Sequence, residues 1–307
     1  MELKAYAKVN LILNVLGTLP SGYHEVCTLM QAIDLCDVVR VGLCGGEGAF
    51  GGKAGQPCML RPEDFEYGKG DLAWKAALLM CEELRPQLVE RDAAGEVSGL
   101  LGISVSIEKH IPAAAGLAGG SSDAAAVMVG LAKLWGLGGA KAAGSAEPKC
   151  TSAAGSAEPK NAETPENSAL LETLLPLGAR LGSDVPFCIA AQLGRRAAIA
   201  TGTGTTLEFV RPTDCKVELF FSEKTLENKT RAVYAELREQ DCSPVRDVRA
   251  FLSAKTIAEK RALMGNHLQA PAERLMQKAY GADWKAGIPQ DAMLCGAGPT
   301  YFRISER

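Results

Sequence analysis

The sequence predicts an α+β protein with two domains. Three observations support this fold class: an alternating strand pattern at the start, a strand, small-residue loop and alanine-rich helix near the middle, and renewed strands beyond about residue 210. A chain of 307 residues has room for two domains, because a domain usually takes roughly 100–200 residues. We expect these domains at 1–195 and 196–307.

The first strand is predicted over 3–15, where every odd position is apolar. Such alternation is typical of a strand with one buried face. Lys8 and Asn10 fall on even positions, so we expect both side chains to point away from the core. A second strand follows over 37–41, and the glycine-rich stretch 42–70 predicts loops and short strands.

Helical spacing predicts a helix over 71–88, and alternation predicts a strand over 102–108. This strand leads into the small-residue loop 112–123, which an alanine-rich helix follows as far as Trp135. Further along, the pattern predicts the following elements: a helix over 170–181, a strand over 216–221, helices around 230–240 and 255–279, and a β-hairpin over 292–304.

Residues 138–169 predict a mobile surface insertion with no chemistry. The segment contains no Val, Ile, Leu, Met, Phe, Tyr or Trp, and the octet Ala-Ala-Gly-Ser-Ala-Glu-Pro-Lys occurs twice, at 142–149 and 153–160. Residues of this kind bury too little apolar surface to offset the entropy lost on ordering.

Composition indicates a globular protein and excludes some partners. Lys and Arg number 33 against 36 Asp and Glu, a net charge of −3, which leaves no surplus positive charge to neutralise a run of phosphates. No stretch approaches the roughly 18 uninterrupted apolar residues of a membrane-spanning helix. We therefore expect neither nucleic acid nor a membrane as partner. We also expect a monomer or weak homodimer.

The ten cysteines include no C-x-x-C pair, and several lie in apolar segments. A reduced thiol in such a segment behaves as a small hydrophobe, so we expect reduced cysteines and a cytoplasmic protein. Three histidines that do not cluster with the cysteines argue against a structural zinc site.

The loop at 112–123 is the most informative feature. Small residues let backbone N–H groups approach a ligand closely, and the start of the following helix adds its positive dipole end, so the loop suits a phosphate. Ser121 and Ser122 offer hydroxyls for a helix cap, a phosphate or Mg²⁺. The alternative is a tight strand-to-helix turn with a serine cap, and neither a P-loop nor a Rossmann motif matches.

Other candidate residues each have a plainer alternative. Asp184, ahead of an apolar run, is either a catalytic acid or a helix cap. Lys8 is either catalytic or a solvated lysine, His24 either binds a ligand or lies in a turn, and Tyr23 is either a ligand contact or a half-buried aromatic. The glycine-rich stretch 295–300 is either part of a site or a hairpin loop.

The combination of these segments, in this order along nearly the whole chain, resembles the GHMP small-molecule kinases. The segments are Ala7–Leu11, Gly22–Glu25, Pro112–Asp123, Gly182–Phe187 and Gly296–Thr300. The loop and the final glycine turn resemble the superfamily as a whole. The Ala-Lys-x-Asn start, Gly-Tyr-His and Asp-Val-Pro-Phe resemble those members that phosphorylate diphosphocytidyl-methylerythritol in the non-mevalonate isoprenoid route.

This resemblance implies a ribosomal protein S5-like N-terminal domain, a ferredoxin-like C-terminal domain, and the use of ATP and Mg²⁺. It implies that Lys8 and Asp184 form the catalytic pair, and that the substrate is bound by Asn10, Tyr23, His24 and Thr230. It also implies that the ATP phosphates lie against Pro112, Ala113, Ala114, Ala115, Gly116, Leu117, Ala118, Gly119, Gly120, Ser121 and Ser122. It assigns no metal ligand.

The chain departs from the family pattern at Ala118, where a third glycine is usual, and at Asp71, where an asparagine near the adenine is usual. Two alternative functions remain at this stage. Another GHMP kinase, for mevalonate or homoserine, would lack the Gly-Tyr-His segment. A catalytically silent nucleotide-binding regulator would have no need of both Lys8 and Asp184.

Overall fold

The computed structural model describes residues 1–44, 59–139 and 164–307. Contacts divide the chain into two compact units. Unit 1 consists of Met1–Ala5, Val38–Glu108 and Gly120–Arg195, and unit 2 of Tyr6–Asp37, Lys109–Gly119 and Arg196–Arg307. The expected domains are two continuous stretches, whereas each unit is assembled from three segments. The difference arises because two long N-terminal strands contribute residues to both units.

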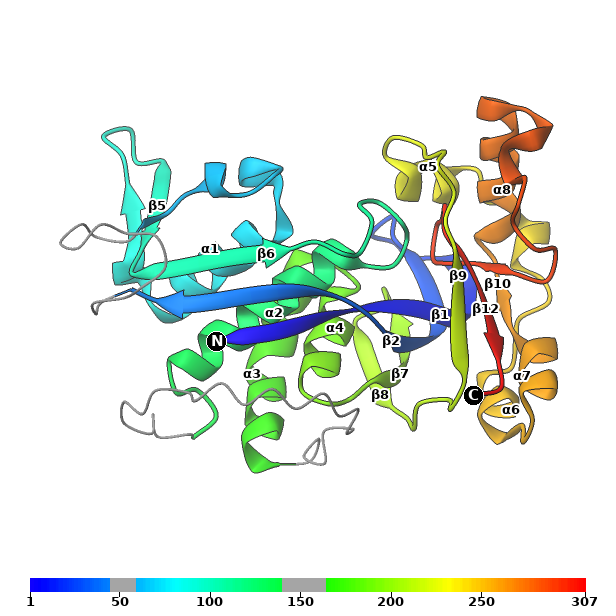
Figure 1. Cartoon of the computed structure of the whole chain (residues 1–307), viewed down its shortest axis with the longest axis horizontal. Helices are drawn as coiled ribbons and strands as arrows, with labels where there is room; N and C mark the ends of the chain where they lie inside the picture. The colour runs from blue at the N-terminus through cyan, green and yellow to red at the C-terminus, as the bar shows by residue number, and fades with distance from the viewer. Residues whose placement is uncertain (45–58, 140–163) are drawn as a thin grey trace. The chain divides into compact units, whose positions relative to one another are not determined.

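These strands are β1 (Glu2–Thr18) and β2 (His24–Leu43), which contain the strands predicted at 3–15 and 37–41. In unit 2 they form the centre of a sheet ordered β10-β1-β2-β7-β8 (Figure 1). The outer strands are β7 (Ala197–Gly202), β8 (Thr206–Phe209) and β10 (Gly265–Asn266). β10 pairs with β1 in parallel, whereas β7 pairs antiparallel with both β2 and β8.

The prediction that one face of the first strand is exposed was wrong. Every residue from Ala7 to Val15 is buried, including Lys8 and Asn10 at 4% and 2% exposure. The polar face is satisfied by protein groups: the Asn14 amide accepts from the Arg246 N–H at 2.8 Å and donates to its carbonyl at 2.9 Å. Alternation identifies the apolar face, but it does not reveal whether other segments cover the polar one.

Unit 2 contains a second sheet, ordered β11-β12-β9 and antiparallel throughout. Its strands are β9 (Lys216–Phe220), β11 (Met293–Leu294) and β12 (Tyr301–Ser305). They confirm the strand predicted over 216–221 and the hairpin predicted over 292–304. The helices of unit 2 are α5 (Lys229–Ala235), α6 (Val248–Ser253), α7 (Ile257–Leu263) and α8 (Gln269–Tyr280). The single helix predicted at 255–279 is therefore two, because Gly265 and Asn266 instead pair with β1.

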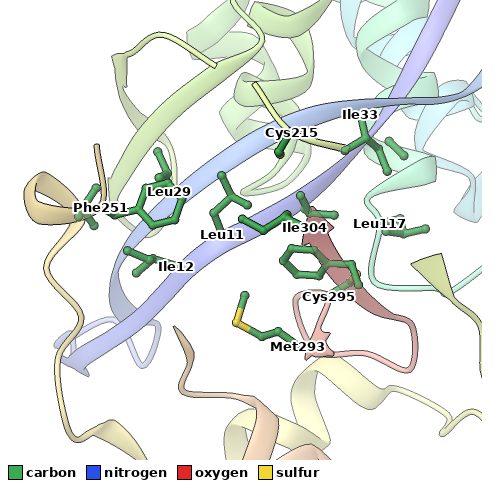
Figure 2. Packing of buried hydrophobic residues seen from close by; sticks show 14 of the residues in the cluster. Leu11, Ile12, Leu29, Ile33, Leu117, Cys215, Phe251, Met293, Cys295 and Ile304 are labelled. Atoms are coloured by element: carbon green, nitrogen blue, oxygen red, sulfur yellow. The ribbon is translucent and has the colours of Figure 1, made fainter. Parts of the chain in front are cut away.

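Apolar side chains from distant segments form the core of unit 2. Figure 2 shows Leu11 and Leu29 of the central sheet facing Phe251, and Leu117 of the loop near Cys295. A second buried cluster gathers Leu13, Val15, Val26, Val233, Leu268, Ala272, Ala292, Leu294 and Tyr301. The small-residue loop is thus attached to the core through its own apolar side chains.

Unit 1 contains four helices among its described residues: α1 (Leu72–Leu84), α2 (Gly119–Leu134), α3 (Pro165–Leu181) and α4 (Val185–Gln192). Its strand β6 (Ile103–Glu108) pairs with Val38–Leu43 of β2. A small sheet is formed by β3 (Met59–Leu60), β4 (Val89–Arg91) and β5 (Val97–Leu101). Short 3₁₀ helices of this unit lie at Pro62–Asp64, Gly68–Gly70 and Pro86–Leu88. Two more lie in unit 2, at Glu239–Cys242 and Ala282–Lys285.

Helix boundaries differ from the predictions in both units: in unit 2, α5 ends at Ala235 rather than near 240, and two further differences lie in unit 1. α1 ends at Leu84 rather than 88, because a separate 3₁₀ turn starts at Pro86. α3 starts at Pro165, with the Thr164 hydroxyl accepting from the Asn167 N–H, so 165–169 are helical rather than part of a mobile insertion. Residues 140–163 of the predicted insertion lie outside the described residues.

The prediction of reduced cysteines holds at seven described positions and was wrong at Cys44. Free thiols are found at Cys27, Cys36, Cys81, Cys188, Cys215, Cys242 and Cys295, whereas Cys44 is disulfide-bonded. Pairing depends on which cysteines meet in space, and sequence spacing does not report that.

None of the helices in the described part of the chain combines the length and the apolar character of a membrane span.

A buried carboxylate fixes the entry to the loop in unit 2. Asp37, at the end of that unit's part of β2, is 0% exposed. One carboxylate oxygen accepts from the N–H groups of His110 and Ile111 at 2.5 and 2.7 Å, and the other accepts from Lys109 Nζ at 2.5 Å. Asp37 therefore binds three consecutive residues just before the loop.

We expect Asp37→Ala to lower the free energy of unfolding by roughly 2–4 kcal/mol, because one buried N–H group, one partly buried N–H group and a partly exposed ammonium lose their acceptor. Urea unfolding measures the change. The matched control is Asp34→Ala on the same strand. Asp34 is 80% exposed and pairs with Arg196 at 2.9 Å, so this change should have little effect. Equal losses in the two variants would contradict the anchoring role of Asp37.

Candidate active site

A chain of buried polar side chains runs from β1 to β2. Lys8 Nζ donates to Asn10 Oδ1 at 2.9 Å, and Asn10 Nδ2 donates to Thr28 Oγ1 at 2.8 Å. The Thr28 hydroxyl donates in turn to the Ile12 carbonyl at 2.7 Å. Each link fixes the orientation of the previous one, so the Lys8 ammonium is held in place rather than solvated, and the solvated-lysine alternative was wrong.

The loop between β6 and α2 packs against the glycine turn of the C-terminal hairpin. The Thr300 N–H donates to the Ala115 carbonyl at 3.3 Å, and the Lys8 N–H donates to the Leu117 carbonyl at 3.0 Å. A Cβ at Gly116 would lie 2.3 Å from the Cys295 carbonyl oxygen. The contact therefore requires glycine at 116, and it brings together two of the segments that the sequence singled out.

Several residues of this loop have left-handed backbone conformations. The φ angles are +53° at Ala114, +82° at Gly116 and +61° at Ala118. Left-handed residues separated by ordinary ones are typical of turns that direct backbone N–H groups to one side, as in anion sites. At Ala118, where a glycine is usual in the family pattern, the left-handed conformation is unfavourable. Steric crowding of the Cβ costs about 1–2 kcal/mol of conformational free energy.

The Gly-Tyr-His segment lies beside α5. The His24 ring stacks on the Tyr234 ring, with centroids 4.7 Å apart and planes inclined by 28°. Tyr23, in the turn before β2, is 65% exposed, so its ring is available for a ligand rather than half-buried. Thr230 is also exposed, one turn before Tyr234. Unit 2 thus brings together three predicted substrate-binding residues.

Asp184 and the two loop serines belong to unit 1. Asp184 occupies the N-cap position of α4, but its side chain makes no capping hydrogen bond. The helix-cap alternative is therefore not supported. Ser121 and Ser122 lie in the first turn of α2, where Ser122 is 1% exposed and Ser121 is more accessible. Asp71 caps α1 by accepting from the Ala73 N–H at 2.8 Å.

Sequence reasoning missed Thr28, Tyr234 and Asp37. Thr28 lies within a strand, and Tyr234 is separated from His24 by more than two hundred residues. No local pattern marks such partners, since each is defined only by what it touches. Asp37 had one signal that was available: an acid at the start of an apolar strand, which has to find hydrogen-bond donors if it is buried.

A cavity of about 780 Å³ in unit 2 contains none of the predicted site residues. It lies between α7, α8 and β12, and two of its three arginines, Arg261 and Arg303, are paired with Asp291. Among the described residues, no group of three or more His, Cys, Asp or Glu side chains suits a metal ion. The buried polar chain and the loop remain the better candidate site.

Comparisons with known proteins show which family this chain resembles. Residues 71–155 match the family model described as the GHMP kinases N terminal domain. A solved structure titled 4-(cytidine 5'-diphospho)-2C-methyl-D-erythritol kinase superposes with a TM-score of 0.64 at 29% identity, covering 100% of this chain and 90% of that one. A mevalonate kinase structure reaches 0.55 at only 12% identity, which shows the fold alone.

Two curated relatives carry the name 4-diphosphocytidyl-2-C-methyl-D-erythritol kinase. The relative from Geobacillus thermodenitrificans is 32% identical over 312 residues, covering 100% of this chain and 88% of its own. The relative from Nostoc sp. is 30% identical over 325 residues, covering 99% and 86%. Fold and loop together define the class of the protein as a GHMP kinase. Within that class, the chain belongs to the 4-diphosphocytidyl-2-C-methyl-D-erythritol kinase family.

We expect Gly116→Ala to lower the free energy of unfolding by about 2–5 kcal/mol, because it combines a left-handed Cβ with overpacking. Thermal and urea unfolding measure the loss. The control is Gly120→Ala, whose Cβ would meet nothing nearer than Leu72 Cδ1 at 3.8 Å. That variant should be as stable as the parent chain or slightly more so, since alanine favours the helix. A well-tolerated Gly116→Ala would contradict the close packing of loop and turn.

Proposed function

We propose that this chain transfers the γ-phosphoryl group of ATP to a hydroxyl of 4-diphosphocytidyl-2-C-methyl-D-erythritol, giving the 2-phosphate and ADP in the non-mevalonate route to isoprenoid precursors. The observation that carries the proposal is the 32% identity, over the whole chain, to a relative with that name. Lys8, Asp184 and the Gly-Tyr-His segment, the residues that distinguish these members in sequence, are all present.

Lys8 and Asp184 are proposed as the catalytic pair. The Asp184 carboxylate, which does not cap α4, accepts or orients the proton of the substrate hydroxyl. The Lys8 ammonium stabilises the negative charge that develops on the phosphoryl oxygens. Asn10 holds that ammonium at 2.9 Å, which positions the charge before the substrate arrives.

The loop Pro112–Ser122 is proposed to bind the ATP phosphates through its backbone N–H groups and the start of α2. Its left-handed residues and its attachment to the glycine turn support this role. Mg²⁺ supplies neutralising charge to the phosphates when bound. The hydroxyls of Ser121 and Ser122 are oxygen donors of the kind that this ion accepts, and it commonly uses few protein ligands beside phosphate oxygens.

Tyr23, His24 and Thr230 are proposed to hold the cytidine end of the substrate. The exposed Tyr23 ring offers a stacking surface. The His24 ring is held by Tyr234 at 4.7 Å, which fixes the direction of its ring nitrogens for hydrogen bonds to a base edge. The proposal includes a cytoplasmic monomer or weak homodimer, and a catalytic N-terminal domain at 1–195.

An ADP-release assay tests the function. Purified chain with ATP and Mg²⁺ should release ADP on addition of diphosphocytidyl-methylerythritol, and only at background rates with mevalonate, homoserine or galactose. The reason is that Tyr23 and His24 have a base to bind only in the first substrate. Preference for mevalonate or homoserine would assign another GHMP kinase, and ATP binding without turnover of any substrate would indicate the silent regulator.

Variants of the catalytic pair test the residue roles. We expect Asp184→Asn and Lys8→Met each to lower kcat by on the order of 10²-fold or more, the usual scale for a positioned proton-transfer group. The double variant should be little worse than the more damaging single one, because residues acting on one step are strongly non-additive. Ser183→Ala, at the exposed neighbouring position, is the control and should keep full kcat. Near-normal turnover in Asp184→Asn would contradict its catalytic role.

A further inference from the structure

Lys229 links two loops that are far apart in the sequence. It is the first residue of α5, and its Nζ donates both to the Ala114 carbonyl in the small-residue loop and to the Gly298 carbonyl in the glycine turn. A lysine ammonium has three donors and no acceptor, so two main-chain oxygens suit its charged form. The side chain lies in unit 2 with both of its acceptors.

The Gly298 carbonyl lies where the loop and the turn pack closely together. The Gly298 oxygen lies only 2.7 Å from where a Cβ of Gly116 would be, and the Thr300 N–H donates to the Ala115 carbonyl beside it. Backbone contacts of this kind are weak singly, and the loop itself has no charged side chain from Pro112 to Ala118. Lys229 therefore adds two hydrogen bonds from a charged ammonium to a contact that otherwise consists of uncharged main-chain groups.

We propose that Lys229 is a positioning residue, whose ammonium ties the small-residue loop to the glycine turn and so holds the loop backbone in the arrangement that accepts the phosphates of ATP. This inference rests on the proposed function of the loop. Its chemistry differs from that proposed for Lys8, because Lys229 acts through the backbone and not on the phosphoryl group.

The surroundings of Lys229 make this tie sensitive to pH. Burial lowers the pKa of Lys229 from its ordinary value to about 8, and the nearby Lys8 ammonium acts in the same direction. Burial in turn raises the pKa of the Cys295 thiol, so that group stays neutral over the same range. Since the charged form makes the two hydrogen bonds, the tie is present below about pH 8 and is lost as the pH rises through that value.

The test measures binding of a non-hydrolysable ATP analogue with Mg²⁺, by isothermal titration calorimetry between pH 6.5 and 9.5. For the parent chain we expect Kd to rise about tenfold from pH 7 to pH 9, since the fraction of charged Lys229 falls about tenfold. Lys229→Arg should remove this dependence, because guanidinium stays charged throughout. Lys229→Met should bind about tenfold or more weakly at pH 7, the scale of a lost hydrogen bond from a charged group.

The control is Lys224→Met, which removes an exposed lysine from the segment between β9 and α5. This variant should keep both the parent Kd and its pH dependence. Any effect of pH on the nucleotide itself is reported by Lys229→Arg, whose guanidinium stays charged over this range. A flat Kd in the parent chain would overturn the proposal. So would an unchanged pH dependence in Lys229→Arg, or normal binding by Lys229→Met with only a lower Tm, which would indicate a purely structural tie.

If Lys229→Met does not fold, the parent chain and Lys229→Arg decide the question. The measurement is independent of phosphoryl transfer. A chain that binds the analogue with the expected pH dependence, but releases no ADP with diphosphocytidyl-methylerythritol, would refute the proposed function and leave the role of Lys229 intact. A chain that releases ADP but shows a flat Kd would do the reverse.

Discussion

The contact between the small-residue loop and the C-terminal glycine turn is the constraint on which the candidate site of unit 2 depends. There is no room for a Cβ at Gly116, where the Cys295 carbonyl oxygen would lie 2.3 Å away. The same loop receives the Lys8 N–H at Leu117 and gives its Ala115 carbonyl to Thr300. Strand, loop and turn are therefore fixed by one set of main-chain contacts.

Two buried charged side chains, Asp37 and Lys8, lie on the loop side of this contact. Asp37 binds the backbone just before the loop, and Lys8 is directed by Asn10, which is directed by Thr28. A buried charge is costly unless its hydrogen bonds are satisfied, so each of these groups is kept in one orientation. A site built in this way is preorganised, which is the usual source of electrostatic catalysis.

The residues proposed to recognise the substrate lie in a different part of unit 2. Tyr23 precedes β2, and His24 stacks on Tyr234 of α5. These groups lie outside the small-residue loop and the glycine turn. In the proposed function, one turn and one helix hold the acceptor while a separate loop binds the phosphates, in keeping with the general rule that function is carried by sites placed on a fold.

The sequence by itself determined the elements whose signal is local. Alternation identified β1 and β6, small residues identified the loop before α2, and five ordered segments identified the class of protein. A residue's own neighbours in the chain carry each of these signals, because strand period, helix spacing and turn chemistry are set over a few residues.

Only the tertiary structure decided the burial of Lys8, the stacking of His24 on Tyr234, and the tie from Lys229 to two loops. It also showed 165–169 as helix and made each unit out of three separate segments. The partners in these contacts are up to about two hundred residues apart, as His24 and Tyr234 illustrate. A lysine or tyrosine has the same local pattern whether a distant segment covers it or water does, so its environment is settled only when the chain has folded.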